Sequence, residues 1–270
     1  MKFLSSIPLA TTSLLLFLLL PSLPARPGYA AAPEGFRVLT EVNGRAVQYH
    51  KGALDGWGVE IVHELMERTG CKAEIEPQPW ARAYGTALTR PNVVIFPITR
   101  TEERDALFHW VGPLFRVQWS FFARKGSGIV INSLDDARKV GSIGTYFNDA
   151  RDRFLLDQGF TNLDRSSSDA TNYRKLEYGR LDLIVGSNTG LAAMADAEGI
   201  DPDNFEEVFP LKEVDLYLAL SLKTDPEVVA AWQEALRQMR EDGTLRRVIQ
   251  RWYPGIEPPD DVRRPWLDKN

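Results

Sequence analysis

Two threonines and two arginines follow an apolar stretch in the first half of the sequence, and together they could bind a negatively charged ligand. The apolar stretch is Val93–Ile98, and the polar residues are Thr99, Arg100, Thr101 and Arg104. A nearly continuous apolar run is typical of a strand that helices cover on both faces. Open α/β sheets bind ligands at the carboxyl ends of such strands. A guanidinium placed there can hold a carboxylate through two parallel hydrogen bonds, each contributing roughly 1.5–3 kcal/mol.

The same segment has a second interpretation. Glu102 and Glu103 stand among the arginines, so these charges could form only the solvated start of a helix. Composition alone does not separate the two interpretations.

Familiar catalytic and metal-binding signatures are absent from the sequence. It contains no G-x-S-x-G, H-E-x-x-H, P-loop or G-x-G-x-x-G motif. His50, His63 and His109 lack metal-ligand spacing, and the single cysteine, Cys71, can form neither an intrachain disulfide nor a cysteine-rich zinc site. We therefore expect no cofactor, no metal and none of the common hydrolase or nucleotide chemistries.

Alternating helices and strands would place the polar residues at one edge of a sheet. Gly58–Thr69 has apolar residues on one face and is followed by Gly70, which predicts an amphipathic helix. The short apolar runs Val140–Ile143 and Leu181–Val185, with helical patterns around them, indicate a second set of strands. This alternation predicts an α/β fold with mostly parallel sheets flanked by helices.

Two longer extended stretches, Val117–Ala123 and Leu216–Leu222, bracket the middle of the chain. If they are paired crossovers that act as a hinge, the chain builds one lobe, then a second, and returns to the first. The boundaries that follow are residues 33–120 plus 217–254 for lobe 1 and residues 121–216 for lobe 2. The Pro-rich, charged residues 255–270 predict an irregular tail.

The first 30 residues predict a secretory signal peptide. Lys2 precedes an apolar stretch that contains the uninterrupted run Leu14–Leu20, and Gly28–Ala30 offers small residues to a signal peptidase. The run is much shorter than the ~20 residues that span a bilayer. We expect cleavage near Ala30 and a periplasmic mature protein.

Composition indicates a globular protein, and the net charge argues against one class of partner, the nucleic acids. The 270 residues are 44% hydrophobic and 26% charged, which is ordinary for a globular protein of one large or two small domains. A formal net charge of −5 argues against a nucleic-acid partner bound through bulk positive charge.

Four stretches give the sequence a resemblance to the periplasmic solute-binding proteins of family three, which serve ABC transporters for polar amino acids. They are Gly56–Ile61, Thr99–Arg104, Gly179–Ser187 and Glu241–Trp252, in the family's order, and the similarity covers about residues 36–252. The resemblance implies the type II fold, in which two crossover strands join two α/β lobes and the ligand is trapped between them. It also implies a membrane permease as partner.

The resemblance further implies ligand contacts in both lobes. Arg104 falls where the family has the arginine that clamps the ligand carboxylate, and Thr99 falls on a supporting hydroxyl. Trp57 falls on an aromatic residue that stacks against the ligand, and Tyr49 is a second candidate for that ring. In lobe 2, the loop with Thr145 and Tyr146 supplies a hydroxyl and backbone N–H groups at the start of a helix, a natural anion site.

Two positions depart from the family pattern. Pro97 stands where amino-acid binders usually have a serine, and Ser187 stands where they usually have the aspartate that pairs with the ligand's ammonium. A buried ammonium without a charge partner is costly. The carboxylate clamp is therefore better supported than an amino-acid ligand, and Ser187 and its neighbour Asn188 are included as candidate contacts.

Trp80 and Arg100 complete the candidate site. Trp80 is as compatible with core packing as with ligand stacking, and Arg100 with facing solvent as with facing the ligand.

The sequence thus predicts a monomeric, non-enzymatic binding protein that captures a small carboxylate-bearing solute, an amino acid or a related metabolite, for an ABC transporter. One alternative is a periplasmic dehydratase-like enzyme on the same fold, for which we can assign no acid or base. Another is a binding protein that presents its closed form to a sensor receptor.

Overall fold

The computed structural model describes residue 33 and residues 35–263, apart from the side chains of residues 195–198. The predicted signal peptide and the last seven residues lie outside the described residues. The strands are β1 (Arg37–Thr40), β2 (Gln48–His50), β3 (Ala53–Asp55), β4 (Ile75–Pro77), β5 (Val93–Thr99), β6 (Phe108–Arg124), β7 (Ile143–Tyr146), β8 (Leu163–Ser166), β9 (Leu183–Ser187) and β10 (Phe205–Ser221).

Helices of very different lengths alternate with these strands. They are α1 (Trp57–Thr69), α2 (Trp80–Thr89), α3 (Glu102–Asp105), α4 (Leu134–Ala137), α5 (Ala150–Asp157), α6 (Asp169–Glu177), α7 (Gly190–Glu198), the 3₁₀ turn η1 (Pro202–Asn204), α8 (Pro226–Glu241) and α9 (Thr244–Trp252). None of the helices in the described part of the chain is long and apolar enough to cross a membrane.

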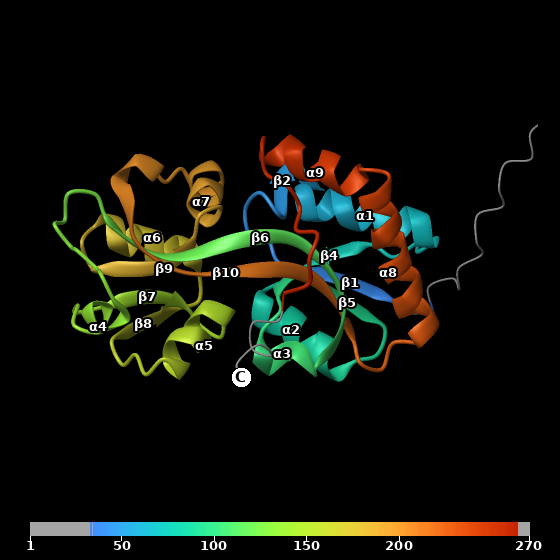
Figure 1. Ribbon diagram of the computed structural model, residues 1–270, viewed down its shortest axis with the longest axis horizontal. Coiled ribbons are helices and arrows are strands. Elements are labelled where there is room, and N and C mark those ends of the chain that lie inside the picture. The colour runs from blue at the N-terminus through green and yellow to red at the C-terminus, as the bar shows by residue number, and fades with distance from the viewer. Residues whose placement is uncertain (1–32, 34, 264–270) are drawn as a thin grey trace, which may run out of the picture.

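One mixed sheet runs through the whole molecule in the order β4-β1-β5-β10-β6-β9-β7-β8, and β2 and β3 form a separate hairpin. At one end β1 pairs in parallel with β4 and β5, and at the other end β7 pairs in parallel with β8 and β9. We call the first end, with α1, α2, α3, α8 and α9, lobe 1, and the second, with α4 to α7, lobe 2 (Figure 1). The predicted two-lobed type II fold is confirmed.

The strands β6 and β10 join the lobes. Each has 17 residues, and they pair antiparallel from Ser221 opposite Phe108 to Phe205 opposite Arg124 (Figure 1). Both are longer than the sequence predicted, because their polar segments carry no unbroken apolar run and only pairing with the neighbouring strand extends them. The pair also merges the two expected sheets into one.

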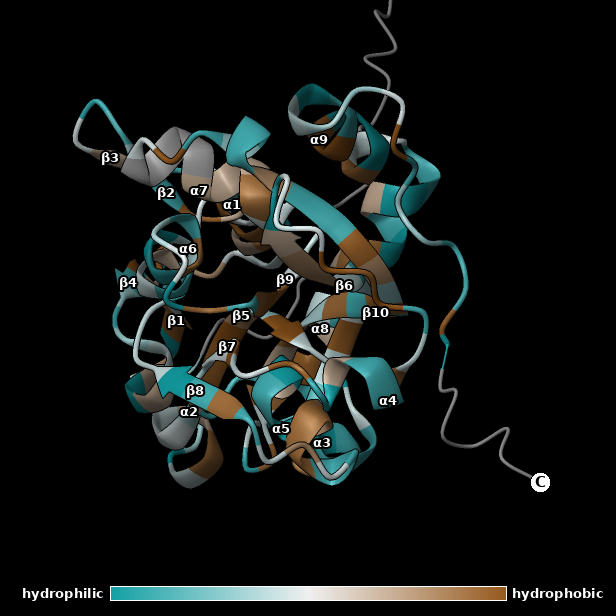
Figure 2. Cartoon of the chain, turned by 90° about the vertical axis from the view of Figure 1, so that its left-hand side faces the viewer, coloured by the Kyte–Doolittle hydropathy of each residue, from teal (hydrophilic) through white to brown (hydrophobic). Residues whose placement is uncertain are grey.

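Each lobe has its own apolar core. In lobe 1 all seven residues of β5 are buried, and α1 and α8 cover the sheet with residues such as Leu65 and Trp232. In lobe 2 Phe121, Leu155 and Leu183 pack together. Figure 2 shows apolar residues concentrated on the central strands and polar residues on the outward parts of the helices and loops.

The described tail beyond Trp252 has no helix or strand and returns across the crossover strands. Asp261 pairs with Arg116 of β6 at 3.0 Å, and Arg263 pairs with Glu213 of β10 at 2.9 Å. The tail therefore contacts both strands that join the lobes.

Candidate ligand-binding cleft

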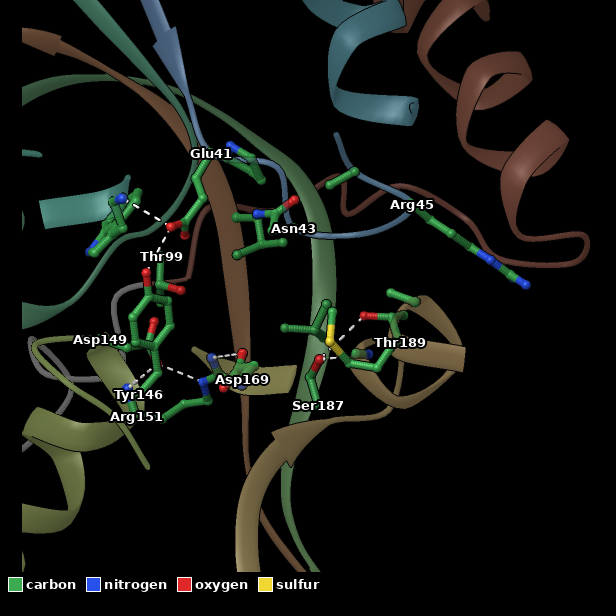
Figure 3. Close-up of a pocket in the computed structure, with 18 of the residues that line it drawn as sticks. Glu41, Asn43, Arg45, Thr99, Tyr146, Asp149, Arg151, Asp169, Ser187 and Thr189 are labelled. Carbon is green, nitrogen blue, oxygen red and sulfur yellow. Dashed lines mark hydrogen bonds and ion pairs between the residues drawn. The ribbon is translucent and has the colours of Figure 1, made fainter. Parts of the chain in front are cut away.

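A cavity of about 290 Å³ lies between the lobes. On the lobe 1 side it is lined by the loop after β1, the end of β5 and α3, and on the lobe 2 side by the end of β7 and the starts of α5, α6 and α7 (Figure 3). The carboxyl ends of parallel strands thus point into the gap from both sides, as expected for ligand sites in open α/β sheets.

Arg104 is the cation of the lobe 1 wall. Its side chain is only 5% exposed, and its guanidinium lies 5.6 Å from the ring centroid of Trp80 and 5.0 Å from that of Tyr84. Nη1 donates a 3.2 Å hydrogen bond to the carbonyl oxygen of Thr99. No ion pair among the described residues includes Arg104. The structure therefore holds a buried positive charge in place with aromatic rings and one carbonyl, and without a carboxylate.

Glu41, directly after β1, connects the two lobes. Its Oε1 accepts hydrogen bonds from the backbone N–H of Trp80 at 2.9 Å and from the Tyr146 hydroxyl of lobe 2 at 2.7 Å. Burial raises the pKa of the Glu41 carboxyl above its usual value, although both hydrogen bonds oppose that shift. Burial likewise raises the pKa of Tyr146. The lobes therefore touch across the cleft through a hydrogen bond to a partly desolvated acid.

A second contact closes the cleft on the opposite side. A Cβ atom added to Gly44 would lie 2.2 Å from Cβ of Ala193 on α7, and Gly44 has a φ of +84°. Only glycine fits this approach without strain. Together with the contact between Glu41 and Tyr146, this packing shows that the structure is closed.

The lobe 2 wall carries a network of ion pairs. Asp149, the N-cap of α5, accepts hydrogen bonds through Oδ1 from the backbone N–H of Arg151 at 3.0 Å and from its Nε at 2.5 Å. Nη2 of Arg151 donates to Oδ2 of Asp169, the first residue of α6, at 2.8 Å. Burial opposes the ionisation of Asp149, but the Arg151 guanidinium outweighs it and lowers the pKa of that carboxyl. For Asp169 burial prevails and the pKa is raised.

The structure brings six of the ten predicted site residues together at the cavity. They are Trp57, Trp80, Thr99, Arg104, Tyr146 and Ser187. Trp57 is buried and stacks on Phe115 with centroids 5.1 Å apart. The Ser187 hydroxyl accepts a 3.0 Å hydrogen bond from the N–H of Gly190 at the start of α7.

Two predicted residues of lobe 1 lie elsewhere. Tyr49 is on the β2–β3 hairpin and is 59% exposed, so its ring faces solvent. Arg100 pairs with Asp105 at 2.5 Å and lies over the rings of Trp110 and Tyr217, and it lines a neighbouring cavity instead. The hairpin position and the local ion pair were not visible in the sequence pattern.

Two predicted residues of lobe 2 also lie away from the cavity. Thr145 is fully buried and donates a 2.8 Å hydrogen bond to Oδ1 of Asp152, because successive side chains of β7 point to opposite faces. Asn188 turns toward β6, where its Oδ1 accepts a 3.1 Å hydrogen bond from the N–H of Gln118.

Sequence reasoning missed five charged residues of the cavity. They are Glu41, Arg45, Asp149, Arg151 and Asp169. The rule that selected Arg104 would also have found Glu41, since that residue directly follows a strand. Asp149 has the position of a helix N-cap in the sequence, but its pairing with Arg151 and, through it, Asp169 depends on the approach of α5 to α6.

Comparison of the chain with known protein families identifies the family to which it belongs. The family of bacterial extracellular solute-binding proteins, family 3, matches residues 36–255. The chain belongs to this family. It is therefore a substrate-binding protein of the type that the four sequence stretches indicated.

Relatives of this family 3 protein bind several different solutes. It is 25% identical over 208 residues to the L-cystine-binding protein TcyJ of Escherichia coli K12, covering 75% of each chain. It is also 23% identical over 211 residues to a probable histidine-binding protein of Neisseria gonorrhoeae, covering 75% of this chain and 76% of that one.

Solved structures share the fold at lower identity. A histidine kinase sensor domain with similarity to periplasmic binding proteins has a TM-score of 0.75 at 19% identity and covers 84% of this chain and 99% of its own. The arginine-, lysine-, histidine-binding protein ArtJ of Geobacillus stearothermophilus has a TM-score of 0.68 at 18% identity and covers 83% of this chain and 96% of its own. The ancestral amino acid-binding protein AncCDT-1, a precursor of cyclohexadienyl dehydratase, has a TM-score of 0.68 at 19% identity and covers 81% and 95%.

Proposed function

We propose that the protein captures a small carboxylate-bearing solute, an amino acid or a related metabolite, and delivers it to the permease of an ABC transporter without altering it chemically. The observation that carries this proposal is Arg104, a buried guanidinium at the cavity with no carboxylate of its own. A buried charge is costly unless it is paired. A ligand carboxylate would supply the missing partner through charge-assisted hydrogen bonds.

The size and position of the cavity fit this role. About 290 Å³ lies at the lower end of the range for small-molecule pockets, which favours a compact metabolite. A ligand that touches both walls stabilises the closed form in proportion to its differential affinity for that form. A closed form that depends on the ligand is the signal that a permease could recognise.

The proposal is tested by measuring ligand binding to Arg104→Gln and Arg100→Gln. A thermal-shift screen of the standard L-amino acids, L-cystine and simple carboxylates first finds a ligand, because a compound that binds only the native state raises its melting temperature. Isothermal titration calorimetry should then give the wild type a dissociation constant on the order of 1 µM, about −8 kcal/mol. We expect Arg104→Gln to weaken binding ~100-fold, since two charge-assisted hydrogen bonds are lost.

The Arg100 variant is the matched control. Its guanidinium also stacks on aromatic rings, but it pairs with Asp105 and lies outside the cavity. Its affinity should stay within about threefold of the wild type. Equal binding by Arg104→Gln and the wild type would refute the carboxylate clamp.

We also propose that the protein acts as a monomer in the periplasm after cleavage near Ala30. Membership of an extracellular family supports export. Mass spectrometry of protein recovered from the periplasm should give an N-terminus at Ala31, and light scattering should give the mass of one chain.

A second candidate function, a dehydratase on the same fold, is favoured by Glu41. This carboxyl has a raised pKa and lies in the cleft, as a general acid would. Incubation with cyclic carboxylic acids, followed by NMR, would reveal turnover that Glu41→Gln abolishes. Unchanged spectra over a day would leave binding as the function.

A further inference from the structure

A short part of the crossover strands belongs to neither lobe. β10 joins the sheet of lobe 1 from Leu216, where it pairs with β5, and β6 joins that of lobe 2 from Trp119, where it pairs with β9. Between these points lie Arg116, Val117 and Gln118 of β6, opposite Asp215, Val214 and Glu213 of β10. These six residues have no other strand neighbour in the described part of the chain. We call them the hinge, because a rotation between the lobes is absorbed by a few such residues.

A bidentate ion pair connects the two strands within the hinge. Nε and Nη2 of Arg116 donate hydrogen bonds to Oδ1 and Oδ2 of Asp215 at 2.6 and 3.0 Å, and the Asp215 side chain is only 6% exposed. Nη2 of Arg116 also donates to Oδ1 of Asp261, in the tail, at 3.0 Å. Two parallel hydrogen bonds fix the orientation of a guanidinium as well as its distance from the carboxylate. Arg116 therefore offers the tail a fixed binding point on the hinge.

The tail is attached to lobe 1 before it reaches the hinge. The Glu257 carboxylate accepts hydrogen bonds from Arg246 and Gln250 of α9, both at 2.7 Å. Pro259 is buried, and its carbonyl oxygen accepts a 2.5 Å hydrogen bond from Nη1 of Arg240 on α8. The tail thus approaches the hinge from fixed points on the helices of lobe 1.

Beyond these points the tail binds both ends of the hinge. Arg263 donates from Nε to Oδ2 of Asp261 and from Nη1 to Oε2 of Glu213, both at 2.9 Å. Arg116 is the hinge residue of β6 nearest to lobe 1, whereas Glu213 is the hinge residue of β10 nearest to lobe 2. Figure 1 shows the tail, in red, crossing β6 and β10 between the lobes. A segment that is fixed to lobe 1 therefore reaches the end of the hinge that moves with lobe 2.

We propose that residues 257–263, which we call the strap, hold the hinge in its closed position. The protein itself then stabilises part of the closed state, and the ligand supplies only the remainder. This inference goes beyond the proposed function, since it does not depend on which solute enters the cleft.

The strap can act in this way because its contacts span the hinge of a closed structure. Opening turns Glu213 relative to the attachment points on lobe 1, which strains or breaks its ion pair with Arg263. One exposed ion pair contributes little, but several charges that form a network contribute more. The apparent affinity for any ligand that binds the closed form increases with the fraction of the protein that is already closed.

The test measures the distance between the lobes without any solute. Spin labels are attached at two exposed positions, through Glu67→Cys in lobe 1 and Tyr178→Cys in lobe 2, with the native cysteine removed by Cys71→Ala. The protein is unfolded, dialysed and refolded to remove bound solutes, and double electron–electron resonance then gives the ratio of closed to open molecules. We expect Arg263→Gln to lower this ratio about threefold at low ionic strength, because its ion pairs with the hinge and with the tail are lost.

Arg251→Gln is the matched control. It also removes an exposed arginine near the C-terminus, but Arg251 pairs with Glu60 at 2.5 Å, and both residues belong to lobe 1. Its ratio of closed to open molecules should equal that of the wild type. At about 1 M NaCl, where the Debye length is roughly 3 Å, the difference between the wild type and Arg263→Gln should disappear. Circular dichroism establishes that each variant is folded.

Several results would overturn the inference. One is an equal ratio for the wild type and Arg263→Gln at low ionic strength, and another is a wild type that is wholly open without solute. An equally large decrease in Arg251→Gln would show that the loss of any exposed arginine has this effect. A difference that persists at high salt would show that the ion pairs of the strap are not its cause. None of these results changes the test of the proposed function, which measures ligand binding to Arg104→Gln.

Discussion

The two walls of the cleft hold their charges in different ways. On lobe 1, the Arg104 guanidinium lies over the rings of Trp80 and Tyr84 and forms no ion pair with a carboxylate of the described residues. On lobe 2, Arg151 forms ion pairs with Asp149 and Asp169, so its charge is balanced by carboxylates of the same lobe. The comparison teaches that charged residues lining one cavity can be balanced by their own lobe on one side and left without a carboxylate partner on the other.

The largest expected effect comes from removing Arg151. Arg151→Ala would leave two partly buried carboxylates without their cation, and loss of one partner of a buried ion pair costs about 3–5 kcal/mol. Urea unfolding followed by circular dichroism should show this loss. Arg153→Ala, on the same helix but exposed, is the control and should change stability by less than about 0.5 kcal/mol. Equal urea midpoints for Arg151→Ala and Arg153→Ala would contradict the conclusion that the ion pairs of Arg151 stabilise lobe 2.

The next largest effect is expected from Gly44→Ala, which disturbs the contact between the two walls. Gly44→Ala would place a Cβ 2.2 Å from that of Ala193 and should hold the lobes apart. We expect at least a tenfold loss of affinity, about 1.4 kcal/mol, in calorimetry.

The control for Gly44 is Gly52→Ala. Gly52 has a nearly identical φ, +83° against +84°, but nothing lies within 4 Å of its Cβ position. It reproduces the backbone strain without the collision. If both variants lose affinity equally, the cause is the local backbone and the contact between the lobes is irrelevant.

A smaller effect concerns Glu41 and depends on pH. Because burial raises its pKa, the native state binds this proton more tightly than the unfolded state. The resulting stability is fully present below the unfolded pKa of about 4.3 and is lost as pH rises through the native one. Glu41→Gln, which stays neutral, should therefore melt above the wild type at pH 7, and the difference should vanish near pH 4 in calorimetric scans.

Glu76 should show the opposite dependence of stability on pH. Its hydrogen bonds to Arg37 lower its pKa, so its contribution to stability is present above the ordinary glutamate value and is lost as pH falls. Glu76→Gln should accordingly melt slightly below the wild type at pH 7. The same direction of shift for both variants would show that the pKa assignments are mistaken.

The smallest effect is expected at Tyr49. Its exposed ring lies on the β2–β3 hairpin, outside the cavity. Tyr49→Ala should leave ligand affinity within about twofold of the wild type, because no contact in the closed cleft is lost. A tenfold loss in calorimetry would mean that the hairpin moves onto the ligand and that the sequence-based assignment of Tyr49 was correct.

The elements were predictable where local chemistry defines them. The apolar run before Thr99 became β5, and the helix before Gly70 became α1 and ends at that glycine with a φ of +69°. The lengths of the crossover strands were not predictable, because pairing between strands about 100 residues apart extends them through polar segments.

The sequence by itself determined the order of helices and strands, the two-lobed family and the position of Arg104 after a buried strand, since each depends on nearby residues and regular spacing. Only the tertiary structure decided which charges meet across the gap. Glu41 and Tyr146 are 105 residues apart, and Arg151 reaches Asp169 across 18 residues. Such contacts depend on how two separately folded lobes and their helices approach, and a difference of a few ångströms turns a ligand contact into an internal pair.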